Sequence, residues 1–165
     1  MTFRSLLADR IAIEESLIRY ARGVDRIDVP MIKSAFWPDA TDDHGTFDGR
    51  AVDFADYLGT SLRKFEATTH VLSNIHVELE GNIARVESYV TATHVLRPEA
   101  GGFRFVVAGR YVDRFERRGD EWRIAARKLV VDWLDVPEEA SAIRAHLAQI
   151  TERGRSSPDD FWYQQ

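Results

Sequence analysis

The chain of 165 residues is long enough for one domain with a substantial hydrophobic core and too short for two independent ones. Cysteine is absent, which excludes disulfides, thiol nucleophiles and cysteine-ligated metals, and 44% hydrophobic with 30% charged residues is typical of a globular protein. The net charge of −5 disfavours nucleic acid, and neither a signal peptide nor a membrane-spanning segment is expected, so we predict a cytoplasmic protein.

The first third of the chain has the pattern of helices. Apolar residues recur at helical spacing, and Asp28 and Pro30 suit the start of a short second helix that Pro38 would stop. Helices are therefore expected over 3–24, 29–37 and 50–65. Between the last two, a segment rich in Asp, Thr, Gly and His predicts turns and short strands.

From residue 68 the composition changes to long runs of Val, Thr, Ile and aromatic residues. Short connections that contain Gly separate these runs, which predicts antiparallel strands over 68–79, 83–97, 103–117 and 121–135. A last helix is expected within 138–153, before a polar end that contains Phe161-Trp162-Tyr163. The pattern is that of an α+β fold in which helices pack on one face of a curved antiparallel sheet. Such a fold makes a cone with a mouth, which suits a small-molecule pocket.

Asp25 is the first candidate for chemistry. It follows Leu7, Ile11 and Ile18 on one stripe of the first helix, so we expect it on the buried side. Burial there would raise the pKa of the carboxyl towards that of a useful base. The alternative is that the helix ends earlier and that Asp25 only caps the next segment.

Histidines provide the next candidates. His70, Leu72, Asn74 and His76 share one face of their strand, a mixed face that suits a polar pocket, although His70 could also lie on a partly exposed sheet face. No third ligand is spaced with His70 and His76, so no metal site is expected. The Asp42-Asp43-His44 triplet lies in a turn-rich segment, and we expect it to be solvated.

Arg127 lies in the middle of an apolar row that ends at Trp133. An arginine in such a row is rarely unpaired, so it closes a structural ion pair or faces an electronegative ligand group, and the residues alone favour the ion pair. Tyr20 lies on the flank of the first helix's apolar stripe, as a core tyrosine or as a pocket hydroxyl.

Several segments together resemble the SnoaL-like branch of the nuclear transport factor 2-like superfamily, which includes scytalone dehydratase, ketosteroid isomerase, bile-acid 7α-dehydratase and hexachlorocyclohexane dehydrochlorinase. The resemblance extends over about residues 6–135. It rests on Arg19-Tyr20-Ala21-Arg22-Gly23-Val24-Asp25, Phe36-Trp37-Pro38-Asp39-Ala40, Gly45-Thr46-Phe47-Asp48-Gly49, Thr69-His70, and Tyr111-Val112-Asp113-Arg114-Phe115-Glu116-Arg117 followed by Trp122.

The resemblance implies a set of catalytic residues. Asp25 and His70 match the Asp–His pair of the dehydratases and the dehydrochlorinase, and Arg127 matches the arginine of the dehydrochlorinase. Tyr20 stands where the dehydrochlorinase has a lysine and is similar to a tyrosine of the bile-acid dehydratase, which favours a hydroxyl or carbonyl substrate. In the implied mechanism Asp25 orients His70, His70 abstracts a proton, and Arg127 and Tyr20 stabilise developing charge.

The function implied in this way is a lyase that needs neither cofactor nor metal, a dehydratase-like elimination that releases a small fragment such as water or formaldehyde. The alternatives are an isomerase or polyketide cyclase, and a non-catalytic ligand-binding protein or dioxygenase β-subunit-like protein. The substrate is expected to be small, hydrophobic, and aromatic or alicyclic. The candidate binding residues are Trp37, Phe54, Tyr57, Leu72, Asn74, Tyr89, Phe105, Leu129 and Trp133.

The resemblance also bears on assembly and on domain organisation. Superfamily members form dimers or trimers, so a homo-oligomer is expected, with a trimer favoured. Trp122, Ile124 and Val130 alternate opposite the Arg127 row and would supply an interface on the outer face of the sheet. We assign 1–135 to the SnoaL-like domain and 136–165 to a C-terminal helix and aromatic tail of the same domain, a tail that could close a pocket.

Overall fold

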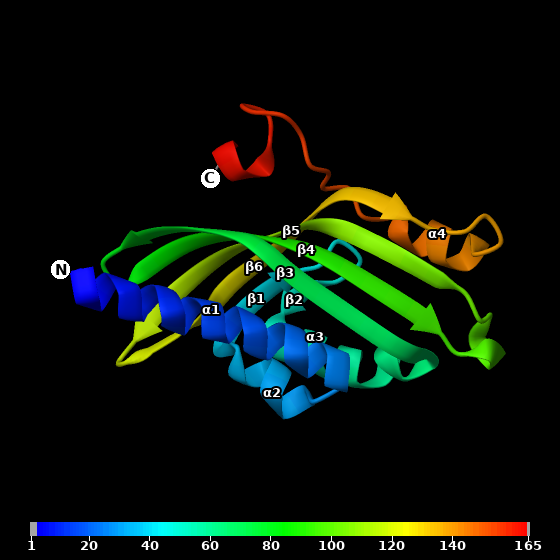
Figure 1. Cartoon of the computed structure of the whole chain (residues 1–165), viewed down its shortest axis with the longest axis horizontal. Coiled ribbons are helices and arrows are strands. Elements are labelled where there is room, and N and C mark those ends of the chain that lie inside the picture. The colour runs from blue at the N-terminus through cyan, green and yellow to red at the C-terminus, as the bar shows by residue number, and fades with distance from the viewer. Residues whose placement is uncertain (1–2, 165) are drawn as a thin grey trace.

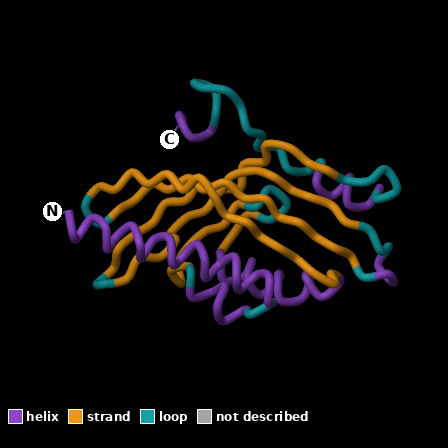
Figure 2. The backbone as a smooth tube through the Cα atoms, in the orientation of Figure 1, coloured by secondary structure: helices purple, strands orange, loops and turns teal. Residues whose placement is uncertain are grey.

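The structure is a computed structural model that describes residues 3–164. The first three helices of the chain lie against one face of a long curled sheet, and the C-terminal turn lies on its opposite side (Figures 1 and 2). The α-helices are α1 (Phe3–Arg26), α2 (Val29–Ser34), α3 (Ala51–Ser61) and α4 (Ser141–Leu147). The strands are β1 (Phe36–Asp43), β2 (Asp48–Arg50), β3 (Phe65–Glu80), β4 (Ile83–Leu96), β5 (Arg104–Arg118) and β6 (Glu121–Asp135).

The helices confirm most of the sequence-based boundaries. Asp28 caps α2 by accepting a hydrogen bond from the Met31 backbone N–H at 3.0 Å, and Pro30 lies in the first turn as expected. The second helix nevertheless ends at Ser34, and the prediction that Pro38 stops it was wrong, because Pro38 lies inside β1. Residues 62–64 form a 3₁₀ turn after α3, and the last helix is limited to α4.

The sheet has the strand order β2-β1-β6-β5-β4-β3 and does not close. Its four long strands form the predicted antiparallel meander, with short connections between consecutive neighbours. The pattern of the four runs did not indicate that β1 pairs in parallel with β6, since that pairing joins residues more than 80 positions apart. This long-range pairing places the end of β1 beside the residues around Arg127.

Bulges change which face of the sheet several side chains occupy. Two residues of β6 oppose one of β5 near Ala125, and again near Asp132, so strict alternation fails along this strand. Trp122 and Ile124 consequently lie in the core with Arg127, and Val130 is covered by Trp162 from the other side. The predicted interface of Trp122, Ile124 and Val130 is therefore wrong, because all three are buried within the single chain.

A bulge in β3 has the same effect. Its register shifts between Ser73 and His76, and Asn74 takes a left-handed backbone conformation with φ 47°, which asparagine tolerates better than most residues. Residues on opposite sides of this bulge change parity, so Val77 is buried on the same side as His70 while Val71 is 55% exposed.

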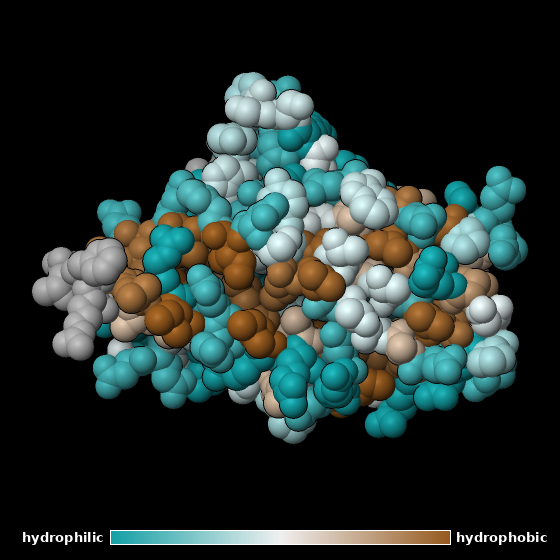
Figure 3. Space-filling model, in the orientation of Figure 1, coloured by the Kyte–Doolittle hydropathy of each residue, from teal (hydrophilic) through white to brown (hydrophobic). Residues whose placement is uncertain are grey.

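Helix α1 is rotated relative to the expectation from its pattern. Its buried stripe contains Ile13, Leu17, Tyr20 and Val24, whereas Leu7, Ile11 and Ile18 are about half exposed. Figure 3 shows apolar surface gathered over the part of the molecule where α1 lies in Figure 1. The stripe used to predict burial of Asp25 is therefore an exposed one, although Asp25 itself is partly enclosed.

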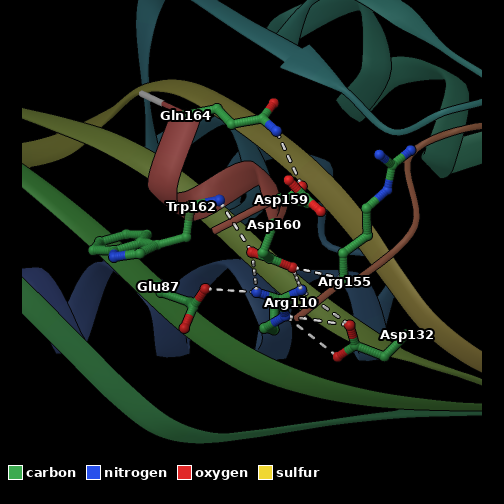
Figure 4. A network of polar contacts seen from close by, with 8 residues as sticks. All are labelled: Glu87, Arg110, Asp132, Arg155, Asp159, Asp160, Trp162 and Gln164. Atoms are coloured by element: carbon green, nitrogen blue, oxygen red, sulfur yellow. Dashed lines mark hydrogen bonds and ion pairs between the residues drawn. The ribbon is translucent and has the colours of Figure 1, made fainter. Parts of the chain in front are cut away.

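The C-terminal turn (Phe161–Gln164) is held to the sheet by Arg110 of β5 (Figure 4). The Arg110 guanidinium contacts three carboxylates, with distances of 2.9 Å to Glu87, 3.1 Å to Asp132 and 2.7 Å to Asp160. Asp160 also accepts the backbone N–H of Trp162, whose ring covers Val112 and Val130. The aromatic tail thus packs on the outer face of the sheet.

Helix α1 is the longest helix among residues 3–164, and it is amphipathic. No helix of this described part of the chain is long and apolar enough to cross a membrane.

Candidate active site

A cavity of about 160 Å³ lies between the helices and the curled sheet. Its wall is mainly apolar and includes Val24, Leu58, Phe65, Val90, Ala92 and Val107. Ile143 and Leu147 of α4 and Ile150 close one side, so the segment after β6 is part of the cavity wall. Four of the chain's five histidines, His44, His70, His94 and His146, also line this cavity.

Asp25 and His70 form a hydrogen-bonded pair at the cavity wall. Asp25 lies in the last turn of α1, and His70 lies on β3 with its side chain 7% exposed. His70 Nδ1 and Asp25 Oδ1 are 2.7 Å apart, and the other carboxylate oxygen accepts the His70 backbone N–H at 3.0 Å. Thr68 adds a third bond to the carboxylate at 3.0 Å. The predicted proximity of Asp25 and His70 is therefore present.

This geometry fixes the tautomer of His70. An ionised carboxylate only accepts hydrogen bonds, so Nδ1 of His70 must carry the proton and Nε2 is left free to accept one in the neutral ring. Burial alone would raise the pKa of the Asp25 carboxyl, but the hydrogen bonds from the His70 side chain and backbone outweigh burial and lower it. The expectation of a raised pKa for Asp25 was wrong, and the acceptor for a substrate proton is the His70 ring.

Tyr20 and Tyr111 form a second part of the cavity wall. Their rings meet edge to face at 5.7 Å, and both side chains are almost fully buried. Burial raises the pKa of Tyr20 well above its ordinary value, so its hydroxyl keeps its proton and can donate it in a hydrogen bond. Tyr20 is thus a core tyrosine that also lines the cavity, and Tyr111 is a neighbour that the candidate residues did not include.

Arg127 lies behind these tyrosines and does not line the cavity. Its guanidinium forms two hydrogen bonds to Asp113, at 2.7 and 2.8 Å, and both side chains have no exposed surface. Its Cζ atom lies 3.9 Å from the centroid of the Tyr111 ring and 4.2 Å from that of the Tyr20 ring. The ion-pair alternative for Arg127 therefore describes its position, and direct contact with a substrate in the cavity does not.

Asp42 and His44 form another carboxylate–imidazole pair at the cavity. His44 Nδ1 lies 2.8 Å from Asp42 Oδ1, and the Asp42 side chain has no exposed surface. The prediction of a solvated triplet was wrong for Asp42, because the pairing of β1 with β6 covers it. The His44 ring packs against Phe54 at 4.5 Å and lines the cavity.

His94 occupies the wall beside His70. The two rings are 5.6 Å apart, and His94 stacks on Phe105 at 4.7 Å with the planes almost parallel. Burial, with the nearby His70, lowers the pKa of His94 to about 3, so its ring is neutral at physiological pH. Sequence reasoning missed His94, although its alternation with Ala92 and Val90 on one face of β4 could have indicated it.

The predicted substrate-binding residues separate into two sets. Phe54, Tyr57, Phe105 and Leu129 line the cavity. Trp37 instead donates a hydrogen bond to the Glu116 carbonyl at 3.0 Å, near the far end of the sheet. The residues outside the cavity wall are Trp37, Leu72, Asn74, Tyr89 and Trp133, and for Asn74 and Trp133 the reason is the bulges that end strict alternation.

Among residues 3–164, no group of three or more His, Asp or Glu side chains is arranged to hold a metal ion. The polar side chains of the cavity wall carry imidazole and hydroxyl groups, together with the ammonium group of Lys64.

The helices, the curled sheet and the cavity between them define an α+β cone with the hydrogen-bonded Asp25–His70 pair at its wall. The chain belongs to the family of SnoaL-like domains, whose family model matches residues 5–128. The resemblance inferred from the sequence segments is confirmed by this match.

Individual relatives agree with this assignment. An uncharacterized protein of Mycobacterium tuberculosis is 29% identical over 125 residues, which cover 73% of this chain and 84% of that protein. A crystal structure from Novosphingobium aromaticivorans, provisionally assigned as a scytalone dehydratase, is 21% identical with a TM-score of 0.72 and covers 82% of this chain and 93% of its own. The hexachlorocyclohexane dehydrochlorinase of Novosphingobium barchaimii is 19% identical with a TM-score of 0.74 and covers 83% and 95%. At these identities the two structures show the fold.

Proposed function

We propose that this protein is a cofactor-independent lyase that eliminates a small fragment from an aromatic or alicyclic compound. The single observation that carries the proposal is the 2.7 Å contact between His70 and Asp25 at the wall of a largely apolar cavity. Membership of the SnoaL-like family, with a dehydrochlorinase and a provisional dehydratase among its structural relatives, supports a lyase-like or isomerase-like enzyme that acts on small molecules.

The proposed chemistry begins with proton abstraction. The Nε2 atom of His70 removes a proton from a carbon next to a carbonyl group, while Asp25 stabilises the imidazolium that forms. The hydroxyl of Tyr20 donates a hydrogen bond to the carbonyl oxygen as negative charge develops there. Arg127 acts through Tyr20, because its guanidinium lies against the tyrosine ring and outside the cavity wall.

The size of the cavity supports a substrate with one ring. An apolar cavity of about 150 Å³ in another protein binds benzene, and this cavity measures about 160 Å³. Phe54, Tyr57 and Phe105 add aromatic surface to the cavity wall, and Leu129 adds aliphatic surface. These contacts favour an aromatic or alicyclic compound over an extended polar one.

An isomerase or cyclase acting on a ketone is the alternative, since the same pair could move a proton without releasing a fragment. The neutral hydroxyl of Tyr20 at the cavity favours it equally, because an enolate forms in both reactions.

The test is a panel of single-ring β-hydroxy ketones incubated with the protein in D₂O and analysed by mass spectrometry. A lyase gives a product lighter by the released fragment, an isomerase gives an unchanged composition with deuterium incorporated, and a binding protein gives neither. The His70→Ala variant should lose turnover, whereas His76→Ala, which changes a 58% exposed histidine of the same strand, should keep it. Full turnover by His70→Ala would refute His70 as the base.

We also propose that the protein forms a homo-oligomer, with a trimer favoured over a dimer. The exposed stripe of Leu7, Ile11 and Ile18 on α1 supports this proposal, because a second copy could cover it. Light scattering after size-exclusion chromatography measures the mass directly. An Ile11→Lys variant should give a smaller particle than the wild type, and a wild-type monomer would refute the proposal.

A further inference from the structure

The strongest unassigned feature of the cavity is its other carboxylate-bound histidine. We propose that His44, oriented by Asp42, is the general acid that protonates the leaving group while His70 removes the carbon-bound proton. This inference rests on the proposed lyase function and adds a second catalytic residue to it. Three observations support it: the position of His44, the burial of Asp42 with one unpaired oxygen, and the placement of the Asp42–His44 and Asp25–His70 pairs in the sheet.

The local structure holds the His44 ring in one orientation. The His44 backbone N–H donates to the Phe47 carbonyl at 2.7 Å, and the Thr46 N–H donates back to the His44 carbonyl at 2.9 Å. On the side chain, Nδ1 is 2.8 Å from Asp42 and the ring packs on Phe54. Because the carboxylate accepts a hydrogen bond from Nδ1–H, the Nε2 atom is the one left for the cavity.

The burial of Asp42 at this position is energetically unfavourable. Its side chain has no exposed surface, and its Oδ2 atom has no hydrogen-bond partner within the described part of the chain. A buried carboxylate with one unsatisfied oxygen destabilises a fold, so holding the loop in place is not a sufficient explanation for Asp42. A carboxylate that must support a positively charged imidazole next to a ligand cavity needs this negative charge.

The two pairs approach the cavity from different parts of the sheet. His44 follows β1 and His70 lies on β3, and three strands, β6, β5 and β4, separate these two in the strand order. The curl of the sheet brings both histidines to one cavity. A bound ring therefore has one imidazole from the β1 side and another from the β3 side, which suits removal of a proton and departure of an oxygen from two neighbouring carbons.

The proposed step balances without any co-reactant. The Nε2 atom of neutral His70 takes the proton from the carbon next to the carbonyl group, and the C–H electron pair passes through the enolate to become the second bond of a carbon–carbon double bond. The C–O bond at the neighbouring carbon breaks with its electrons going to oxygen, and protonated His44 donates its Nε2 proton to that oxygen, which leaves as water. Proton exchange with solvent then returns His70 to the neutral form and His44 to the imidazolium.

The decisive test compares two leaving groups. General acid assistance matters for hydroxide, a poor leaving group, and much less for acetate, which departs without a proton. We would measure elimination from 3-hydroxycyclohexanone and 3-acetoxycyclohexanone by the ultraviolet absorbance of cyclohexenone. His44→Phe keeps an aromatic ring against Phe54, and we expect it to lower kcat for the hydroxyl compound by about 10²-fold or more and for the acetate by less than about 5-fold.

Matched variants separate the possible outcomes. Asp42→Asn should show the same selective loss, His70→Ala should lose both reactions, and His76→Phe should keep both. If the wild type eliminates both groups and His44→Phe slows them equally or not at all, the inference is overturned while the lyase function stands. If the wild type eliminates neither, the lyase function fails for these compounds and the acid role fails with it.

A binding measurement tests the same residue without turnover. The probe is 4-nitrophenol, a single-ring compound whose absorbance near 400 nm reports the phenolate form. If His44 presents an N–H to a ligand oxygen, the wild type and His76→Phe should bind the phenolate, and His44→Phe should bind it at least about 10-fold more weakly. Equal binding by His44→Phe overturns the inference whatever the kinetics show, and His44→Gln serves as the second variant if His44→Phe does not fold.

Discussion

The substitution Asp25→Asn tests how much the Asp25–His70 pair contributes to stability and to activity. The carboxylate accepts three hydrogen bonds, two at Oδ1 from His70 Nδ1 and Thr68 and one at Oδ2 from the His70 backbone. An amide can accept on only one side, so its NH₂ group must face at least one of these donors. That leaves a partly buried donor without an acceptor and removes the charge that strengthened the other bonds.

The expected cost follows from these bonds. An unsatisfied buried donor costs about 1–3 kcal/mol, and a bond to a charged group contributes about 1.5–3 kcal/mol. Because these bonds are only partly buried, the low ends of both ranges apply, and together they predict a loss of about 3 kcal/mol in the free energy of unfolding, or about 6–12 °C in Tm for a chain of this size. Thr68→Val, which removes one bond, should cost about 1 kcal/mol.

Urea unfolding followed by circular dichroism measures these differences. Glu15→Gln, which neutralises an exposed carboxylate on the same helix, is the matched control and should stay within about 0.5 kcal/mol of the wild type. Turnover on any substrate found in the panel should fall by about 10²–10⁴-fold in Asp25→Asn, because the His70 tautomer is no longer fixed. Wild-type stability together with wild-type turnover would refute the idea that Asp25 positions His70.

Three further predictions concern other parts of the molecule. Arg127→Met should reduce the free energy of unfolding by about 3–5 kcal/mol, because it leaves the buried Asp113 carboxylate unpaired, and a loss below about 1 kcal/mol in chemical denaturation would contradict this. Ala92→Phe should fill the cavity and abolish ligand binding in calorimetry while the circular dichroism spectrum stays native, and undiminished binding would place the ligand elsewhere. The hydrogen bonds from Arg110 lower the pKa of Asp160 in the folded chain, so its contribution to stability is present above about pH 4 and is lost as the pH falls further. Acid titration followed by Trp162 fluorescence should therefore show the tail detaching at low pH, with Asp160→Asn already detached at neutral pH.

The periodicity of apolar residues was sufficient to predict the helices and strands, but it was insufficient to predict which side chains each element buries. The runs of β-branched residues and the Gly-containing connections predicted the four long strands and their antiparallel order. The bulges near Asn74, Ala125 and Asp132 could not be predicted from alternation, because one extra residue exchanges the two faces of everything beyond it. This is why Trp133 was expected at the cavity and Ile124 at the surface.

The pairing at the candidate site was predictable only from the family resemblance. Asp25 and His70 lie 45 positions apart, and no spacing rule joins them, so their pairing came from the resemblance alone. Asp42 and His44 were visible as a motif, but burial of Asp42 depends on the parallel pairing of β1 with β6, which brings it opposite Arg127. A contact of this range depends on tertiary structure, which composition and spacing do not contain.

The Arg110 network also has a consequence for binding at the cavity. The segment with Ile143, Leu147 and Ile150 forms one side of the cavity. Strand β6 precedes it, and the chain after it is held first by backbone hydrogen bonds of Glu152 and Gly154 to Val131 and then by the Asp160–Arg110 ion pair. A ligand that packs against this segment therefore draws part of its affinity from contacts made on the outer face of the sheet. By thermodynamic reciprocity, occupation of the cavity should hold the C-terminal turn in place by the same free energy that the turn adds to ligand binding.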